Sequence, residues 1–314
     1  MTPDFTRRSF LMGSATLLGT ALLDSCIGTT TELIAPADIV AWGDSLTQGE
    51  GGTPYPTQLA TLLSGRTVKN FGITGQIAQQ IAARQGGLPV TITVQGNSFA
   101  GTSQVPITTI STQLISTPAN GQVYTINGTV AGVPCVMTRS TTGNPPNRVE
   151  IYTIAPVTAS TASVPAGTQF IPDEAVTNKS AVQLLWMGRN DTRLAGVVDP
   201  LIQASVNYLT APRKALVIGV LSGRNETATT TEGRTISSFN SMLATTYGDN
   251  YVVATPPTDA EMMAIGYTPT DADKASIAAG TWPYDMYSDS VHLKTAGYQI
   301  IANRVAAKLK AKNW

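Results

Sequence analysis

Three continuous apolar runs, each followed by a helical pattern, place the strongest constraint on how this chain can fold. The runs Ile39 to Trp42, Ala181 to Met187 and Ala215 to Leu221 contain no charged residue and are only four to seven residues long. Runs of this kind are typical of strands buried on both faces of a sheet. Helical patterns follow near Gln58 to Leu63 and Leu201 to Leu209. Strands that alternate with helices pair in parallel, so the pattern predicts an α/β fold with a mainly parallel sheet covered on both faces.

The same alternation predicts further elements on either side of these runs. Two more strands and three more helices are expected at 67–71, 76–84, 236–247, 251–254 and 295–309. The segment 255–288, which contains Trp282 and Tyr284, is interpreted as a long connection.

The alternation stops at Gly86-Gly87 and resumes near residue 180. Residues 88–179 are rich in Thr, Val, Ser and Gly, with short alternating runs at 89–94, 122–126 and 149–154 and no helical pattern. Such runs between turns are typical of antiparallel sheets. We therefore predict an inserted all-β module at 88–179, which divides the core into a first part at 38–87 and a second part at 180–314. Within the module, Cys135 is expected to be a buried small hydrophobic residue.

Charge and cysteine content exclude several classes of function. Charged residues make up 13% of the chain and the formal net charge is +0, without any Lys/Arg run. A nucleic-acid partner is not expected, because binding to phosphates requires a basic surface. The two cysteines do not form a disulfide framework and have no metal-ligand spacing, so a structural zinc site is not expected. Neither a metal nor an organic cofactor is expected to be needed.

Residues 1–25 are typical of an export signal. A twin arginine, Arg7-Arg8, precedes the uncharged and mostly apolar segment Phe10 to Leu23, as in bacterial twin-arginine signals. Fourteen residues are too few to span a bilayer comfortably. The signal predicts a bacterial cell-envelope location, periplasmic or extracellular, with residues 26–37 as a tether.

Two ways of processing this signal remain open. Leu23-Asp24-Ser25-Cys26 resembles a lipoprotein box, which would make Cys26 the lipidated residue and a lipid anchor the only contact with a membrane. Asp24 departs from the small or apolar residue usual at that position. The alternative is cleavage after Ala35-Pro36-Ala37, although this site lies far from the apolar segment.

The first apolar run ends at Gly43-Asp44-Ser45-Leu46. A serine at the end of a buried strand is well placed to be a nucleophile, because the strand fixes its position and the following turn leaves its hydroxyl accessible. Asp-Ser at such a point is also ordinary helix-capping chemistry. These residues alone leave both interpretations open.

The chain contains one histidine, His292, three residues after Asp289. A serine nucleophile needs a base, usually a histidine held by a carboxylate. An aspartate at this spacing can reach the Nδ1 atom of the ring, so Asp289 and His292 form a candidate acid–base pair. The alternative is an exposed histidine beside a helix cap.

Two further residues follow strand ends. Gly75 comes after the second predicted strand and Asn190 after the third. Ligands bind at the carboxyl ends of parallel strands, so both can share a cleft with Ser45. A backbone N–H and an amide side chain can stabilise the oxyanion of acyl transfer. Taken singly, each is as well explained by a turn glycine or a helix cap.

Together these segments resemble the SGNH (GDSL-type) esterase and lipase superfamily. Its four blocks are matched by Gly43-Asp44-Ser45-Leu46, Asn70-Phe71-Gly72-Ile73-Thr74-Gly75, Gly188-Arg189-Asn190-Asp191 and Asp289-Ser290-Val291-His292. The resemblance implies a flavodoxin-like three-layer α/β/α core, with Ser45 as nucleophile, His292 as base and Asp289 orienting it. It also implies an oxyanion hole made of the N–H groups of Ser45 and Gly75 and the Asn190 side chain. Ser290 departs from the glycine common in the family, and the choice of Gly75 over Gly72 depends on spacing.

The expected function is an exported serine esterase that acts on a small-molecule ester or an acylated polysaccharide. An O-acyltransferase using the same residues is an alternative. So is a non-catalytic surface protein whose β module binds glycans, although this module has only four aromatic residues, Phe99, Tyr124, Tyr152 and Phe170. Trp282 and Tyr284 are expected to line a wall near His292.

Overall fold

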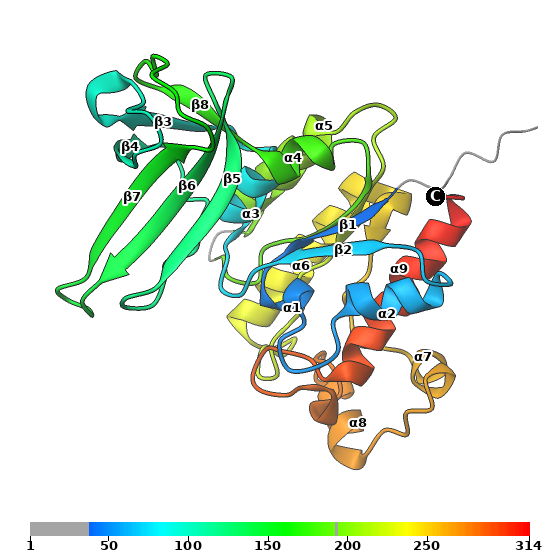
Figure 1. Cartoon of the computed structure of the whole chain (residues 1–314). Coiled ribbons are helices and arrows are strands. Elements are labelled where there is room, and N and C mark those ends of the chain that lie inside the picture. The colour runs from blue at the N-terminus through cyan, green and yellow to red at the C-terminus, as the bar shows by residue number, and fades with distance from the viewer. Residues whose placement is uncertain (1–37, 192–193) are drawn as a thin grey trace, which may run out of the picture. The chain divides into compact units, whose positions relative to one another are not determined.

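The computed structural model describes residues 38–191 and 194–314 (Figure 1). The predicted export signal at 1–25, the tether at 26–37 and the candidate lipidation site Cys26 lie outside the described residues. In the part that is described, no helix combines the length and the apolar character needed to cross a membrane.

A five-stranded sheet forms the centre of the core, and all of its neighbouring strands are parallel. Its strands are β1 (Ile39–Gly43), β2 (Val68–Gly72), β9 (Val182–Trp186), β10 (Ala215–Ile218) and β11 (Tyr251–Val252), in the order β11-β10-β9-β1-β2. With the core strands counted alone, this is the order of flavodoxin-like sheets. The predicted α/β fold class is confirmed.

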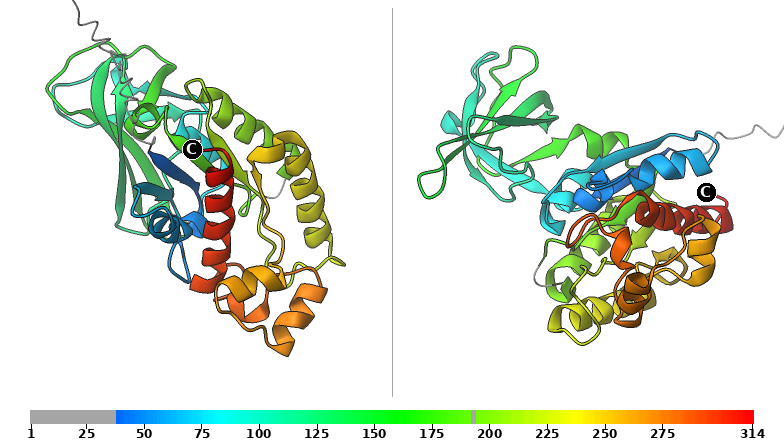
Figure 2. Two further views of the ribbon diagram at one scale, coloured as in Figure 1. Left: turned by 90° about the vertical axis from the view of Figure 1, so that its right-hand side faces the viewer. Right: turned by 90° about the horizontal axis from the view of Figure 1, so that it is seen from below.

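Helices cover both faces because successive side chains of a strand point to opposite sides. Ile39 and Ala41 pack with α2 (Tyr55–Leu62) and α9 (Thr295–Ala311). Val40 and Trp42 pack with helices on the other face, namely α3 (Ala78–Gln85), α5 (Asp199–Tyr208) and α6 (Thr231–Tyr247). In Figure 2, α9 (red) is separated from α5 and α6 (yellow-green to yellow), which cover the opposite face of the sheet. The strand that ends at Ser45 is therefore held rigidly between two layers.

The inserted module is a closed six-stranded antiparallel barrel with its own apolar core around Met137, Ile154 and Phe170. Its strands are β3 (Val90–Val94), β4 (Val105–Ile110), β5 (Val123–Val130), β6 (Val133–Thr142), β7 (Val149–Pro156) and β8 (Thr168–Pro172), with the 3-10 turn η1 (Gln95–Asn97) between β3 and β4. Cys135 is buried with a free thiol, and the prediction of an inserted β module is confirmed.

The prediction that 88–179 contains no helix is wrong. A short helix, α4 (Asp173–Thr177), follows β8 and carries Asp173 and Glu174 in its first turn. Negative charge there stabilises a helix N-terminus. Five residues are too few to show a helical period, which is why the pattern missed it.

The segment 255–288 is also more regular than expected. It holds α7 (Asp259–Ala264), α8 (Asp271–Ala278) and the 3-10 turn η4 (Tyr284–Met286). Both helices begin with a capping box, at Thr258 and Thr270. The remaining elements are the one-turn helix α1 (Ser45–Gln48), the π-helical turn η2 (Leu194–Val198) and the 3-10 turn η3 (Gly248–Asn250). The capping residues were the available signal for α7 and α8.

Candidate active site

Ser45 lies at the carboxyl end of β1 and begins α1. Asp44 Oδ1 accepts a hydrogen bond from the Leu46 N–H at 2.9 Å, so the capping role belongs to the aspartate and leaves the serine hydroxyl available. Gly49 ends the helix at φ +94°. A Cβ atom on Gly43 would lie 2.0 Å from Thr47 Oγ1, so only glycine allows this tight passage from strand to helix.

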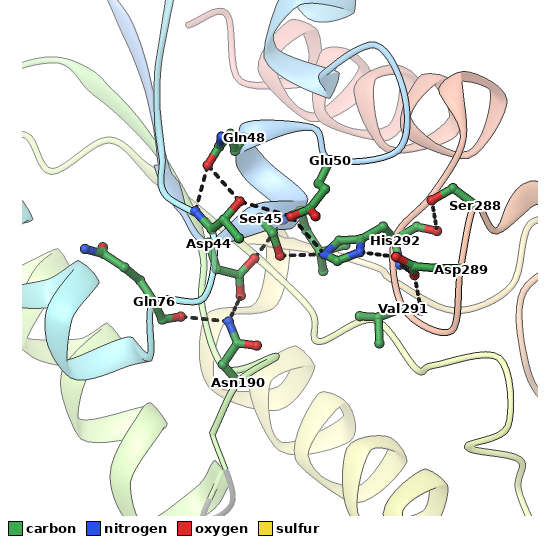
Figure 3. Close-up of polar contacts among 12 residues, drawn as sticks. Asp44, Ser45, Gln48, Glu50, Gln76, Asn190, Ser288, Asp289, Val291 and His292 are labelled. Atoms are coloured by element: carbon green, nitrogen blue, oxygen red, sulfur yellow. Dashed lines mark hydrogen bonds and ion pairs between the residues drawn. The ribbon is translucent and has the colours of Figure 1, made fainter. Parts of the chain in front are cut away.

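The loop before α9 brings His292 to Ser45. His292 Nε2 lies 2.8 Å from Ser45 Oγ, and His292 Nδ1 lies 2.6 Å from Asp289 Oδ2 (Figure 3). The other carboxylate oxygen of Asp289 accepts the backbone N–H groups of Val291 and His292, both at 2.7 Å. Asp289 thus orients the ring and shapes the loop at once. The three side chains form one continuous hydrogen-bonded chain.

The environment of Asp289 keeps its carboxylate ionised. Partial burial opposes ionisation, but the hydrogen bonds from the His292 ring and from the backbone N–H groups of His292 and Val291 prevail and lower the pKa of Asp289 to about 2. A carboxylate in this state holds Nδ1 protonated and leaves Nε2 free to accept the serine proton.

Asn190 and Gly75 are the other two candidate residues of the site. The Asn190 amide donates to the backbone oxygen of Gln76 at 2.9 Å and approaches Asp44 Oδ2 at 3.5 Å (Figure 3). The first contact is firm and the second is long, so one N–H of this amide can turn toward a ligand. Gly75 adopts φ +76°, and a Cβ atom there would meet nothing within 4 Å.

The two glycines of the second block differ in their surroundings. A Cβ atom on Gly72 would lie 2.1 Å from the backbone nitrogen of Gln48, so Gly72 is needed for packing between β2 and α1. Gly75 lies in an open loop with a backbone conformation that glycine favours. The structure thus gives Gly72 a packing role, and Gly75 as the oxyanion-hole glycine stays a prediction.

Sequence reasoning missed a polar network between α1 and the loop after β2. Gln48 Oε1 accepts the Thr74 N–H at 2.7 Å. Glu50 Oε2 lies 3.0 Å from Thr74 Oγ1 and 3.5 Å from His292 Nε2. These contacts join loops 24 to 26 residues apart. The only available signal was that Gln48 and Glu50 closely follow the nucleophile block.

Two more polar groups near the site were also missed. Arg189, next to Asn190, donates to both carboxylate oxygens of Glu226 at 2.6 and 2.7 Å. Gln76 binds the barrel, because its side-chain amide donates to the Leu114 backbone oxygen at 3.3 Å and to Ser116 Oγ at 3.1 Å. The inserted module thus steadies the loop whose backbone holds Asn190.

The expectation that Trp282 lines a wall near His292 is wrong, and the role of Tyr284 in such a wall stays a prediction. Trp282 is fully buried and donates from Nε1 to the Ala254 backbone oxygen at 2.8 Å, so it belongs to the core and not to a cleft. Tyr284 is 45% exposed, and the Arg224 guanidinium lies 4.3 Å from the centre of its ring. A cavity of about 460 Å³ does adjoin the site, lined by Asn190, Arg189 and Glu226 among others.

Asp44 is fully buried, and desolvation raises its pKa from 3.8 to about 7. Between these two values the folded state binds more protons than the unfolded state, so the free energy of unfolding falls as the pH rises. We expect Asp44→Asn to remove this dependence, since asparagine resembles the protonated acid and still accepts the Leu46 N–H. Relative to the variant, wild type should lose roughly 4 kcal/mol between pH 4 and pH 8.

Urea unfolding at both pH values measures this difference. The matched control is Asp249→Asn, because Asp249 is exposed in a turn at the opposite end of the strands. Parallel pH profiles for wild type and Asp44→Asn would show that the Asp44 carboxyl is not destabilised by burial.

The family resemblance implies that Asn190 is an oxyanion donor, and on that expectation its replacement with alanine should lower kcat for ester hydrolysis by about 10²- to 10³-fold with little change in KM, because such a donor acts in the transition state. Steady-state kinetics measures both constants. The lost contact with Gln76 would also cost stability, so urea unfolding is measured alongside. A stable variant whose kcat stays within threefold of wild type would leave Asn190 with a structural role only.

Residues 38–191 and 194–314 contain no group of three or more His, Cys, Asp or Glu side chains arranged to hold a metal ion. The groups that the site brings together are a hydroxyl, an imidazole and a carboxylate.

Comparison with known proteins shows that the fold of this chain is similar to that of several solved structures. No family model and no curated protein matches the chain. Similar solved structures include a protein of the G-D-S-L lipolytic family from Desulfitobacterium hafniense, with 13% identity, a TM-score of 0.45 and coverage of 87% of this chain and 99% of that one. A G-D-S-L family protein from Veillonella parvula has 12% identity, a TM-score of 0.43 and coverage of 85% and 95%.

A third similar structure is LAE5, an alpha/beta hydrolase enzyme from the metagenome of Lake Arreo, Spain. It has 11% identity, a TM-score of 0.42 and coverage of 88% of this chain and 97% of that one. Two of these three similar structures are thus described as G-D-S-L family proteins.

Proposed function

We propose that this protein is an exported serine esterase that hydrolyses carboxylic esters of short acyl groups, including O-acetyl groups on carbohydrates, through an acyl-enzyme. One observation carries the proposal. Asp289, His292 and Ser45 are joined at 2.6 and 2.8 Å, at the carboxyl edge of the sheet. This is the arrangement that activates a serine hydroxyl at neutral pH.

In the first step, His292 Nε2 takes the proton of Ser45 while Oγ attacks the ester carbonyl. The imidazolium formed is stabilised by Asp289, which stays ionised throughout. The same Nε2 then gives the proton to the departing alcohol. In the second step His292 activates a water molecule, which releases the acid and restores Ser45.

The negative charge that develops on the carbonyl oxygen needs donors. The backbone N–H groups of Ser45 and Gly75 supply two of them, and the Asn190 amide supplies the third by exchanging its 3.5 Å approach to Asp44 for the substrate oxygen. Its 2.9 Å bond to Gln76 keeps the amide in place during this exchange. Donors fixed in advance in this way account for much of the rate enhancement of acyl transfer.

Location is a proposal that depends on the sequence. The twin arginine and the apolar segment at 1–25 support export to the cell envelope, and Cys26 supports a lipid anchor there.

The test is hydrolysis of p-nitrophenyl esters from acetyl to long acyl chains, combined with mass spectrometry of the acyl-enzyme. We expect turnover of the short esters and an acylated peptide containing Ser45, while Ser45→Ala forms no such adduct. Adding an acylated glycan donor and a free glycan separates hydrolysis, which releases free acid, from acyl transfer. Full activity in Ser45→Ala would refute the proposed function.

A further inference from the structure

Glu50 is a carboxylate placed directly beside the reacting atoms (Figure 3). Its backbone is fixed on both sides, because its N–H donates to the Ser45 backbone oxygen at 3.0 Å and its carbonyl oxygen accepts the Tyr298 hydroxyl at 2.8 Å. The side chain is 47% exposed. The carboxylate is therefore open to solvent beside His292 Nε2, on a backbone that is held at both its N–H and its carbonyl oxygen.

The described part of the protein offers little positive charge and few hydrogen-bond donors to the negatively charged Glu50 carboxylate. Oε2 lies 3.0 Å from the Thr74 hydroxyl and 3.5 Å from His292 Nε2. Thr74 has one hydroxyl hydrogen, and this hydrogen is shared between Glu50 Oε2 at 3.0 Å and Gln48 Oε1 at 2.9 Å. Among the described residues, the ion pairs of Glu50 are limited to His292, which is charged only when protonated.

In the part of the chain that the structure describes, the guanidinium groups of Arg189 and Arg224 are engaged with partners other than Glu50. Arg189 is paired with Glu226 through two hydrogen bonds. Arg224 lies over the rings of Tyr284 and Tyr287 and donates to the Tyr287 backbone oxygen. The negative charge of Glu50 can therefore interact electrostatically with a substrate that binds next to His292 Nε2.

The position of the Glu50 carboxylate determines which part of a bound ester lies next to it. Nε2 must hand its proton to the oxygen of the departing alcohol, so a group 3.5 Å from Nε2 lies on the alcohol side of the ester. A carboxylate there opposes the oxyanion of the transition state unless the substrate brings a positive charge to offset it.

We propose that Glu50 is a specificity-determining residue that selects esters whose alcohol part carries a positive charge. The inference depends on the proposed esterase function and adds a substrate class to it. Because Glu50 is half exposed, solvent and salt screen its field, and we expect a preference of about tenfold over a neutral ester of equal shape, equivalent to about 1.4 kcal/mol.

Acetylcholine and 3,3-dimethylbutyl acetate provide the matched pair of substrates. They have the same shape and the same acyl group and differ in a quaternary nitrogen against a quaternary carbon. The measured quantity is the ratio of their kcat/KM values, followed in a pH-stat by release of acetic acid. Wild type should favour acetylcholine about tenfold at low ionic strength, and this ratio should fall as salt is added.

In Glu50→Gln, which removes the charge and keeps the size, the ratio should fall close to one. Asp249→Asn, with the same change of charge in an exposed turn far from the site, should keep the wild-type ratio. A ratio near one in wild type, or an unchanged ratio in Glu50→Gln, would overturn the inference. So would a complete loss of both activities in folded Glu50→Gln, because Glu50 would then serve catalysis rather than selection.

The outcome also separates this inference from the proposed function. If wild type hydrolyses p-nitrophenyl esters but neither acetate ester, the esterase assignment stands and the selection of cationic alcohols is wrong. If wild type hydrolyses none of these esters and acylates no serine, the proposed function fails and this inference fails with it.

Discussion

Replacing His292 with glutamine is expected to lower kcat for ester hydrolysis by about 10⁵- to 10⁶-fold, as loss of the base of a Ser–His pair usually does. His292 is the only histidine in the chain, so no other imidazole can take over its role. Its Nε2 atom lies 2.8 Å from Ser45 Oγ, and no rearrangement is needed for proton transfer. Steady-state hydrolysis of p-nitrophenyl acetate measures the effect, and urea unfolding shows whether the variant is folded.

A double variant sharpens this test. Ser45 and His292 act as one unit, so Ser45→Ala combined with His292→Gln should be no slower than either single variant. If the two losses multiplied instead, the side chains would contribute independently. The hydrogen bond between them would then not be the one used in catalysis.

Replacing Asp289 with asparagine is expected to lower kcat about 10⁴-fold. Asparagine can still accept the backbone N–H groups of Val291 and His292 through one oxygen, which preserves the loop. It presents an NH₂ group to His292 Nδ1 in place of the carboxylate oxygen at 2.6 Å. The ring would then keep its proton on Nε2, where it cannot accept from Ser45.

The measurement is kcat at pH 7 together with the unfolding transition, and Asp249→Asn serves as the control for loss of one negative charge. A loss of tenfold or less in a stable Asp289→Asn would mean that the carboxylate only shapes the loop. Wild type itself should keep Asp289 ionised throughout any practical pH range, because its pKa is about 2.

The core could be predicted because its strands are buried on both faces and leave uninterrupted apolar runs. Ile39–Gly43 and Val182–Trp186 are fully buried, and the sequence pattern located both strands. The candidate residues Ser45, Asn190 and His292 follow from the same order, since the ends of parallel strands meet at one edge. Because the chain contains one histidine, His292 was the only candidate for a histidine base.

The parts that escaped prediction depend on contacts between distant segments. The sequence places Trp282 close to His292, which suggested a residue that lines a cleft. In the structure, however, its Nε1–H donates a hydrogen bond to the backbone oxygen of Ala254, 28 residues away. Glu50 has no distinguishing neighbours in the sequence, and its position beside His292 exists only after residues 242 positions apart are brought together. Closure of the barrel likewise depends on the pairing of β3 with β8, which no local pattern encodes.

Ser45 and His292 are separated by 247 residues along the chain. A nascent chain therefore carries its serine long before it carries a base, and that serine is an ordinary alcohol until the loop before α9 docks. On the proposed mechanism, partly synthesised or partly folded molecules should not hydrolyse esters. The onset of hydrolytic activity during refolding would therefore report the time at which the loop before α9 docks.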